Sequence, residues 1–336
     1  MDVRQPPAYE ELWLVRNLGW LLATVSFVGL AALPLIIDNR TSFIATTVMC
    51  FGIVGLSVGL LTGYAGQLSL AQFAYGGVAA AVSIYVVNAT GVFFAGIVAG
   101  AVVASLLSVL VGLPAIRVQG LLLAVGTLGF ALVVTSWLLR QDFMLGRGVV
   151  PPQPIIGSWI VDTPREYFVV ALAALAFALW LVRNVRRGLL GRRMIAVRDN
   201  EAAARALTVR SVRVKLQVYA ISGAVAGLGG AMFGHAHSNL TASIFPVVAS
   251  VDVVTETAIG GLGALTGPLV GALYLVGIPR FFEVSPEGLA TLSAAWLILL
   301  TEQPKGILAL ATRARDRVYD FVAKMHGVDP VVARAT

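Results

Sequence analysis

Two acidic residues, Asp252 and Glu256, lie inside an apolar segment long enough to cross a membrane, and they are the first candidates for chemistry. Their spacing of four residues places both carboxyl groups on one face of a helix. Ionisable side chains at membrane depth are costly and usually face a bundle interior or a cavity. The pair could therefore bind a proton or an ion, or line a solute path. The alternative is that both acids lie in an aqueous vestibule.

A second set of polar side chains interrupts the glycine-rich stretch from Gly59 to Gly77. The set consists of Thr62, Tyr64, Gln67, Ser69, Gln72 and Tyr75. Broken helices and polar groups are tolerated at membrane depth only against protein or a water-filled cavity. The pattern indicates either a translocation path or ordinary hydrogen bonding between helices. We take Tyr64, Gln67, Ser69 and Gln72 as the path candidates.

A third candidate is a short helix in the longest polar segment of the chain. Asp199 or Asn200 can cap this helix, and Glu201 is favourable at its positive N-terminal end. Arg205 follows Glu201 by four residues, in the favourable order for an ion pair. The helix body, Ala202 to Leu207, has small side chains and could enter a cleft on another protein. Alternatively, the segment is a solvated loop that only sets membrane topology.

Other common kinds of catalytic or binding site have no support in the sequence. It has no GxxxxGK[ST] phosphate loop, so we do not expect the chain to hold ATP in the P-loop manner. Energy for transport would then come from a partner or from an ion gradient. The three histidines are scattered, and the single cysteine, Cys50, cannot form an internal disulfide or a cysteine cluster. We expect no catalytic residue, no metal site and no cofactor.

Membrane-spanning helices must position these candidates. The chain of 336 residues is 58% hydrophobic and only 12% charged, whereas soluble domains carry about 25% charged residues. We therefore expect an all-α, polytopic transmembrane helical bundle. The net charge of +7 comes with no zinc-finger, helix-turn-helix or RNP pattern, so we expect no nucleic-acid partner. Apolar windows predict ten spans, near 18–37, 42–61, 67–88, 92–112, 118–139, 166–182, 216–234, 246–262, 265–281 and 288–303.

The basic residues predict the orientation of these spans. Lys and Arg concentrate in cytoplasmic loops, and both the segment 183–215 and the tail 304–336 are rich in them. If both are cytoplasmic, an even number of spans must separate them. The ten-span topology meets this condition, places 19 of the 24 basic residues inside, and makes both termini cytoplasmic. Eight spans with two re-entrant segments is the alternative.

Three blocks of sequence carry a family resemblance. They are TGYAGQLSLAQ (Thr62–Gln72), RDNEAAARALTV with VKLQVYAISGAVAGLGGAMF (within Arg198–Phe233) and IGGLGALTGPLVGA (Ile259–Ala272). Weaker matches are IRVQGLLLAVGTLGF (Ile116–Phe130) and QPKGIL (Gln303–Leu308). Together they resemble the membrane-spanning permease subunits of branched-chain amino acid ABC importers, a family that also includes urea and short-amide permeases.

The resemblance implies one importer transmembrane domain over residues 1–336, in the plasma membrane of a bacterium or archaeon and in contact with membrane lipid. It implies as partners two cytoplasmic ABC ATPase subunits, a second related permease and an extracytoplasmic solute-binding protein. The proline-rich segment 145–165 could dock a soluble partner or merely join two helices. The solute stays open between branched-chain amino acids and urea, amides or other amino acids. The competing classes are an ion-coupled transporter or channel using Asp252 and Glu256, and a membrane scaffold.

The resemblance also implies roles for individual residues. The coupling helix that docks on the ATPase would comprise Asn200, Glu201, Ala202, Ala203, Arg205 and Leu207. Thr127 and Asp252 would join the glycine-rich candidates along the translocation path. The family commonly has glycine where this chain has Ala71, Ala79 and Thr208, which predicts a narrower path and a different end to the coupling helix. Glu256 replaces an apolar residue of the family.

Overall fold

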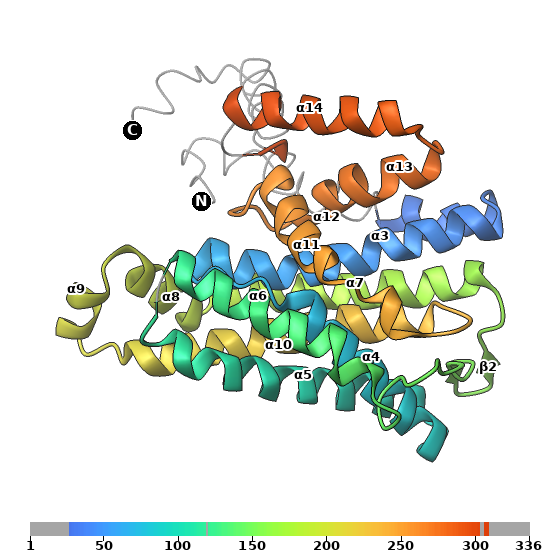
Figure 1. The fold of residues 1–336 in the computed structure, drawn as a ribbon, viewed down its shortest axis with the longest axis horizontal. Helices are drawn as coiled ribbons and strands as arrows, with labels where there is room; N and C mark the ends of the chain where they lie inside the picture. Colours follow the sequence, from blue (N-terminus) through green and yellow to red (C-terminus); the bar gives the residue numbers. More distant parts are fainter. Residues whose placement is uncertain (1–26, 119, 303–305, 309–336) are drawn as a thin grey trace, which may run out of the picture.

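The structure is a computed structural model that describes residues 27–118, 120–302 and 306–308 (Figure 1). Residues 18–26 of the first predicted span, 18–37, and nearly all of the predicted tail, 304–336, lie outside these residues. The described chain is mostly helical and has very little strand. Its helices are α3 (Asn39–Val58), α4 (Gln72–Thr90), α5 (Phe93–Ala115), α6 (Leu121–Ser136), α7 (Pro164–Arg187), α8 (Leu189–Asp199), α9 (Glu201–Ala206), α10 (Ser211–His235), α11 (Val247–Gly260), α12 (Gly267–Ala272), α13 (Ile278–Phe281) and α14 (Pro286–Glu302).

Shorter elements join or extend these helices. Two π-helical turns follow α3 and α12, at Gly59–Tyr64 and Leu273–Gly277. Three 3-10 turns occupy Leu33–Leu35, Leu138–Arg140 and Ala242–Ile244. Strands β1 (Ile155–Ile156) and β2 (Trp159–Ile160) pair antiparallel within the predicted 145–165 loop.

Within the described residues, seven helices are long and apolar enough to cross a membrane. The chain is therefore a helical, multi-pass membrane protein, as the composition predicted. The segment predicted as span 265–281 is a shorter, interrupted apolar helix over Gly267–Phe281. The last predicted span forms α14, which has 17 residues. The count of ten crossings and the position of the termini remain predictions.

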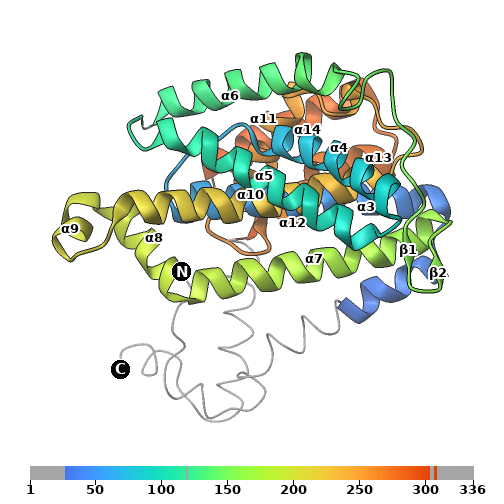
Figure 2. The same cartoon turned by 90° about the horizontal axis from the view of Figure 1, so that it is seen from below.

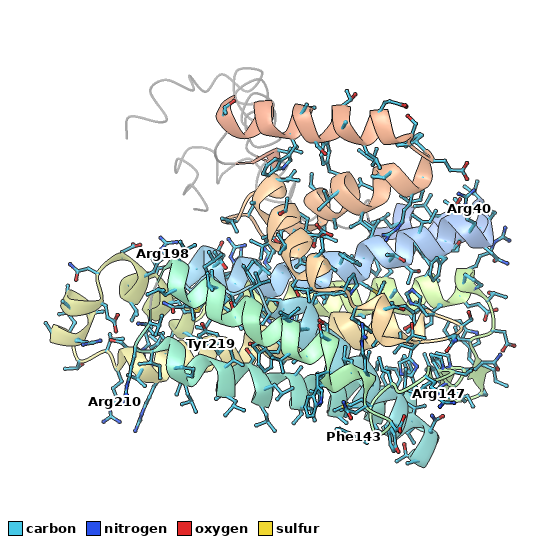
Figure 3. All side chains as sticks on the ribbon, in the orientation of Figure 1. Arg40, Phe143, Arg147, Arg198, Arg210 and Tyr219 are labelled. Carbon is cyan, nitrogen blue, oxygen red and sulfur yellow. The ribbon has the colours of Figure 1, made fainter. Side chains whose placement is uncertain are left out.

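The bundle has two distinct ends (Figures 1 and 2). Helices α8 and α9 project at one end, and the β1–β2 hairpin lies at the other. Figure 3 places Arg198 and Arg210 at the α8–α9 end and Arg40 and Arg147 at the opposite end. The most basic segment of the chain is therefore separated by the length of the bundle from the hairpin loop.

Helices α3 and α10 form the centre of the bundle. Residues 46–58 of α3 are all buried, because α3 packs against α7, α10, α11 and α12. Helix α10 packs in turn on α4 and α5. A helix that is apolar all round is typical of such a fully enclosed position.

Glycines allow α10 to approach its neighbours closely. A Cβ atom on Gly230 would lie 2.1 Å from the Cα atom of Gly76 on α4, and one on Gly223 would lie 2.4 Å from the Cβ of Ser108 on α5. Gly227 and Gly234 are similarly confined. These glycines therefore serve helix packing, which in lipid depends on close contact of small residues. Gly263 differs, because nothing lies within 4 Å of the Cβ position there.

Candidate coupling and transport site

Helix α9 forms at the end of the bundle, where the sequence predicts a capped helix. Asn200 is its N-cap, and its side-chain oxygen accepts a hydrogen bond from the backbone N–H of Ala203 at 3.0 Å. This bond satisfies one of the N–H groups that every helix start leaves without an intrahelical partner. Asp199, the other predicted cap, instead forms an ion pair with Arg198 at 2.9 Å. Local sequence is therefore enough to begin this helix.

Glu201 braces α9 against the start of α10. Its carboxylate accepts a hydrogen bond from Lys215 Nζ at 2.9 Å and forms an ion pair with Arg205, one turn further along α9. Partial burial disfavours the charged form of Glu201, but the hydrogen bonds and charges of Lys215 and Arg205 outweigh it and hold the pKa of Glu201 below its ordinary value. Arg205 also donates to Ser211 Oγ at 3.1 Å. Glu201 thus faces its own chain.

The outward face of α9 is small and mostly apolar. Ala202 and Ala203 are exposed, and Leu207, directly after the helix, is 77% exposed. Ala204 points inward and is buried. Arg205 supplies the charge on this face. Such a surface has the shape to enter a shallow cleft, with one leucine available as an apolar anchor.

Thr208 ends α9 in an unusual backbone conformation. Its φ is 63°, in the left-handed region that favours glycine. The N–H of Thr208 donates to the carbonyl of Arg205, and the N–H of Val209 donates to that of Ala204, both at 3.0 Å. These bonds close the helix as left-handed C-terminal turns do. Thr208 therefore takes the backbone conformation that a glycine would take here, and whether the helix end differs from that of the family stays a prediction.

Arginines of the same segment contact both glycine-rich stretches. Arg198 Nη1 donates to the carbonyl of Gly63 at 2.7 Å, and Arg186 Nη2 donates to the carbonyl of Gly263 at 3.3 Å. The guanidinium of Arg186 also lies over the Tyr64 ring, 4.3 Å from its centroid. The Tyr64 hydroxyl donates to the same Gly263 carbonyl at 2.7 Å. The segment 183–215 is thus bonded to the turns that follow α3 and α11.

The glycine-rich stretches also touch one another directly. The π-helical turn at the end of α3 places Gly63 so that a Cβ atom would lie 2.1 Å from the carbonyl oxygen of Leu262. Gly66 then turns the chain with φ 67°. Single π turns within helices often occur at functional sites. Glycine is required here by the close approach of two backbones.

The predicted path residues Gln67, Ser69, Gln72 and Thr127 are all buried. Thr127 Oγ1 on α6 accepts a hydrogen bond from the backbone N–H of Leu70 at 2.9 Å, which joins it to the segment that leads into α4. Neither of the two clefts described below is lined by these four residues. In this structure the protein therefore encloses them.

Gln72 is the centre of a hydrogen-bonded contact between three helices. Its Oε1 accepts from Ser57 Oγ of α3 at 3.1 Å and from Ser222 Oγ of α10 at 3.4 Å. Its Nε2 has no partner among the described residues. This arrangement matches the interhelical hydrogen bonding that the sequence left open as the alternative to a path.

Asp252 and Glu256 share α11 but not their surroundings. Glu256 is fully buried, and neither carboxylate oxygen has a hydrogen-bond partner in the described part of the chain. A Cβ atom on Gly55 of α3 would lie 2.9 Å from Glu256 Oε1. Asp252 is half-buried and interacts electrostatically with Arg280. The alternative that the acids lie in an aqueous vestibule is therefore wrong for Glu256, and Asp252 is not one of the hydrogen-bond partners of Gln72.

Two contact residues, Lys215 and Ser222, went unrecognised in the sequence as partners of the candidates. In the sequence Lys215 lies directly before the predicted span 216–234, which is typical of a topology charge. Helix α10 begins earlier, at Ser211, and so includes Lys215. Ser222 gives no signal either, because a serine in an apolar helix commonly bonds to its own backbone and its spacing does not identify a distant partner.

A mostly apolar cleft of about 230 Å³ lies between α11, α14 and the helical segment 273–279. Its lining is mostly apolar and includes Ile259, Leu275 and Trp296. It has no charged side chain. It therefore offers no site for the predicted chemistry.

Comparisons with known proteins agree on one family. The sequence model of the family described as "Branched-chain amino acid transport system / permease component" matches residues 40–301. The chain is 25% identical over 321 residues to the high-affinity branched-chain amino acid transport system permease protein LivM of Escherichia coli K12, covering 87% of this chain and 75% of that relative. No solved structure matches the chain.

Shorter matches involve other permeases. The high-affinity branched-chain amino acid transport system permease protein LivH of Salmonella typhimurium is 27% identical over 175 residues, which is 48% of this chain and 56% of that relative. The fructose import permease protein FrcC of Rhizobium meliloti is 36% identical over 117 residues, covering 33% of this chain and 32% of that relative.

Proposed function

The chain belongs to the family of permease components of branched-chain amino acid transport systems, and we propose that it is one membrane-spanning subunit of an ATP-driven importer for these amino acids. The long match to LivM supports this solute class more than the shorter match to a fructose permease. Urea, amides or other amino acids are the alternative solutes. The chain acts as a transport subunit and not as an enzyme, in a bacterial or archaeal inner membrane.

Helix α9 is the docking element for a cytoplasmic ATPase. The observation that carries this proposal is its combination of an exposed, small-faced surface with rigid internal support. Ala202, Ala203 and Leu207 are available to a partner, while Glu201 and Lys215 hold the helix to α10. On this proposal the segment 183–215 is cytoplasmic, and so is the tail 304–336, which lies almost entirely outside the described residues.

The fastening of this segment explains how movement would reach the pore. When a partner ATPase closes on ATP, it would shift α9 together with the arginines behind it. Arg198 would pull on the Gly63 carbonyl and Arg186 on the Gly263 carbonyl, to which they are bonded. Coupling between distant sites requires such a packed element with two arrangements. The π-helical turn at 59–64 is the part of α3 suited to rearrange.

The solute would pass near the segment 64–72, Thr127 and Asp252. Gln67, Ser69 and Gln72 supply polar groups at membrane depth but are enclosed here, so this conformation corresponds to a closed path. A second related permease would complete the pore, two ATPases would drive it, and an extracytoplasmic binding protein would deliver the solute at the opposite, β-hairpin end.

Ala203→Asp tests the docking proposal and leaves the bonds from Glu201 to Lys215 and Arg205 in place. We expect the variant to insert normally but to lose ATPase association and uptake, because a desolvated carboxylate in an apolar contact is costly. Ala196→Asp, at an exposed alanine of α8, is the matched control and should retain uptake. The measurement is ATP-dependent uptake of labelled leucine by the full complex in proteoliposomes.

The same experiment separates the importer from an ion-coupled transporter. If uptake survived Ala203→Asp and was abolished by an uncoupler and by Asp252→Asn, the importer proposal would be overturned. If the fully assembled complex moved no solute, including leucine and urea, a scaffold role would be favoured.

A further inference from the structure

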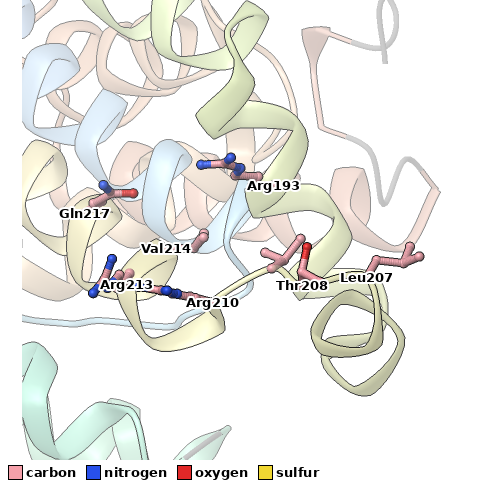
Figure 4. A pocket seen from close by; sticks show the side chains of 8 residues that line it. Arg193, Leu207, Thr208, Arg210, Arg213, Val214 and Gln217 are labelled. Carbon is pink, nitrogen blue, oxygen red and sulfur yellow. The ribbon is translucent and has the colours of Figure 1, made fainter.

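A basic cleft lies beside the end of α9 (Figure 4). It has a volume of about 360 Å³ and is formed by α8, the connection after α9 and the first turns of α10. Its lining residues are Arg193, Leu207, Thr208, Val209, Arg210, Arg213, Val214 and Gln217. Apart from Leu207, which also belongs to the α9 face proposed for the ATPase, these residues have no part in the roles proposed above.

The cleft carries uncompensated positive charge. Three of its lining residues, Arg193, Arg210 and Arg213, are arginines, and no acidic residue lines it. All three arginines are exposed, and no ion pair joins any of them to the described residues. Glu201, the acid at the start of α9, is already bound by Arg205 and Lys215. Guanidinium groups free of acids favour an anionic ligand with several oxygens, such as a phosphate.

The start of α10 adds to this preference. Arg210 is the N-cap of a helix of 25 residues, and no side chain caps its first N–H groups. A helix N-terminus of this length presents partial positive charge and free donors to an anion. The Thr208 hydroxyl is a further donor at the cleft. The arginine side chains and the backbone N–H groups at the start of α10 therefore each favour an anionic ligand.

The position of the cleft selects the source of the phosphate. Helix α10 is apolar and long enough to span a membrane. A membrane placed around this helix would put Arg210 and Arg213, at its start, near the depth of the lipid headgroups. Leu207, Val209 and Val214 supply apolar surface on the same lining. A ligand with a phosphate and an apolar body would match both the arginines and the apolar residues of this lining. Basic pockets at the ends of spans are suited to anionic headgroups.

We propose that this cleft binds the phosphate of an anionic phospholipid. The arginines hold the phosphate oxygens, and the lipid body lies along Val209 and Val214. Because Leu207 and Thr208 also end α9, a bound lipid would stiffen the connection between α9 and α10. The inference depends on the membrane placement of α10 and not on the solute that the permease carries.

The test uses calorimetry to measure the binding of dioctanoyl phosphatidylglycerol to the purified full chain in a neutral detergent. We expect saturable binding that Arg193→Gln weakens at least about tenfold, as loss of a charge-assisted hydrogen bond does. Arg192→Gln is the matched control, because Arg192 is the adjacent exposed arginine on α8 and does not line the cleft. It should change the affinity less than twofold. Circular dichroism and elution volume report whether each variant folds.

Two further ligands identify the source of the anion. Dioctanoyl phosphatidylcholine should bind much more weakly, and inorganic phosphate should not compete at millimolar concentration. Equal binding of free phosphate would overturn the lipid assignment in favour of a soluble anion. Equal losses in Arg192→Gln and Arg193→Gln would overturn the site itself. Absence of lipid binding together with a cross-link from position 213 to an acidic segment of the ATPase would assign the cleft to that partner.

Discussion

Lys215 Nζ lies 2.9 Å from Glu201 Oε2 and donates a hydrogen bond to it, although fourteen residues separate the two in sequence. The Lys215 side chain is only 4% exposed, and that of Glu201 is 21% exposed. Their pairing sets the position of α9 relative to the membrane-spanning helix that follows it. An ion pair of this kind has a large effect when one member is removed, because the other charge stays withdrawn from water.

The first prediction concerns this pair. Glu201→Gln should destabilise the packing of α9 on α10 by about 3 kcal/mol, because Lys215 is left without its anion. The double variant Glu201→Gln with Lys215→Met should recover much of this loss. Hydrogen exchange of the α9 amides in detergent measures the local opening free energy. Additive effects of the two substitutions would show that the pair is not coupled.

A pH dependence follows from the lowered pKa of Glu201. A carboxyl whose pKa is lower in the folded state stabilises that state above its unfolded pKa and loses this contribution as the pH falls through the folded value. A spin label at position 206 should therefore report unchanged mobility from pH 8 to 5. Its mobility should increase only below about pH 4. In Glu201→Gln the label should be mobile throughout, and an acid transition that persisted there would assign the effect to another group.

Thr208 provides a prediction about backbone strain. A side chain in the left-handed conformation costs about 1–2 kcal/mol, whereas glycine adopts it freely but loses about 0.5–1 kcal/mol of chain entropy. Thr208→Gly should therefore leave the opening free energy of α9 unchanged or raise it by up to about 1.5 kcal/mol. Thr208→Val keeps the strain and serves as the control. A clear loss of protection in Thr208→Gly would mean that the hydroxyl has a structural role.

The glycine contact between α4 and α10 can be tested by a single methyl group. Gly230→Ala should prevent normal packing, because the new Cβ would lie 2.1 Å from the Cα of Gly76. We expect destabilisation of at least about 3 kcal/mol, as for severe overpacking. Gly263→Ala is the control, since its Cβ meets nothing within 4 Å. Equal thermal stability of the two variants in detergent would contradict the close approach.

Glu256 distinguishes an importer from an ion-coupled transporter. Its carboxyl is fully buried and has no hydrogen-bond partner among the described residues. If ATP drives transport, Glu256→Gln should retain uptake within about twofold, because the amide has the same shape and buries no charge. If the carboxyl carries a proton or an ion, uptake should be abolished. Leucine uptake in proteoliposomes, with and without an uncoupler, gives the answer.

Local chemistry made part of the site predictable. The Asn200 cap and the Glu201–Arg205 pair depend on residues within one or two turns, and both appear in the structure. The order of apolar segments likewise predicted a helical membrane protein. In both cases the interacting residues are close in sequence, so spacing alone carries the information.

Contacts between distant segments could not be predicted from spacing along the sequence. Lys215 had no visible link to Glu201, and Arg198 had none to Gly63, because each pair is joined only by the way the helices pack. The same limit applies to Glu256. Helical spacing placed it on the same face as Asp252, but the neighbouring α3 covers Glu256 with Gly55 and leaves Asp252 half exposed.

The contact between Gly230 and Gly76 has a mechanical consequence. The two backbones are in direct contact, with no side chain between them that could change rotamer. We therefore expect α4 and α10 to move together as one rigid body. Lys215, which bonds to Glu201 of α9, lies about 22 Å from Gly230 along the axis of α10. A tilt of about 10° imposed at that end would therefore swing the far contact by about 4 Å. A lever of this length converts a small displacement at α9 into a movement comparable to the width of a side chain.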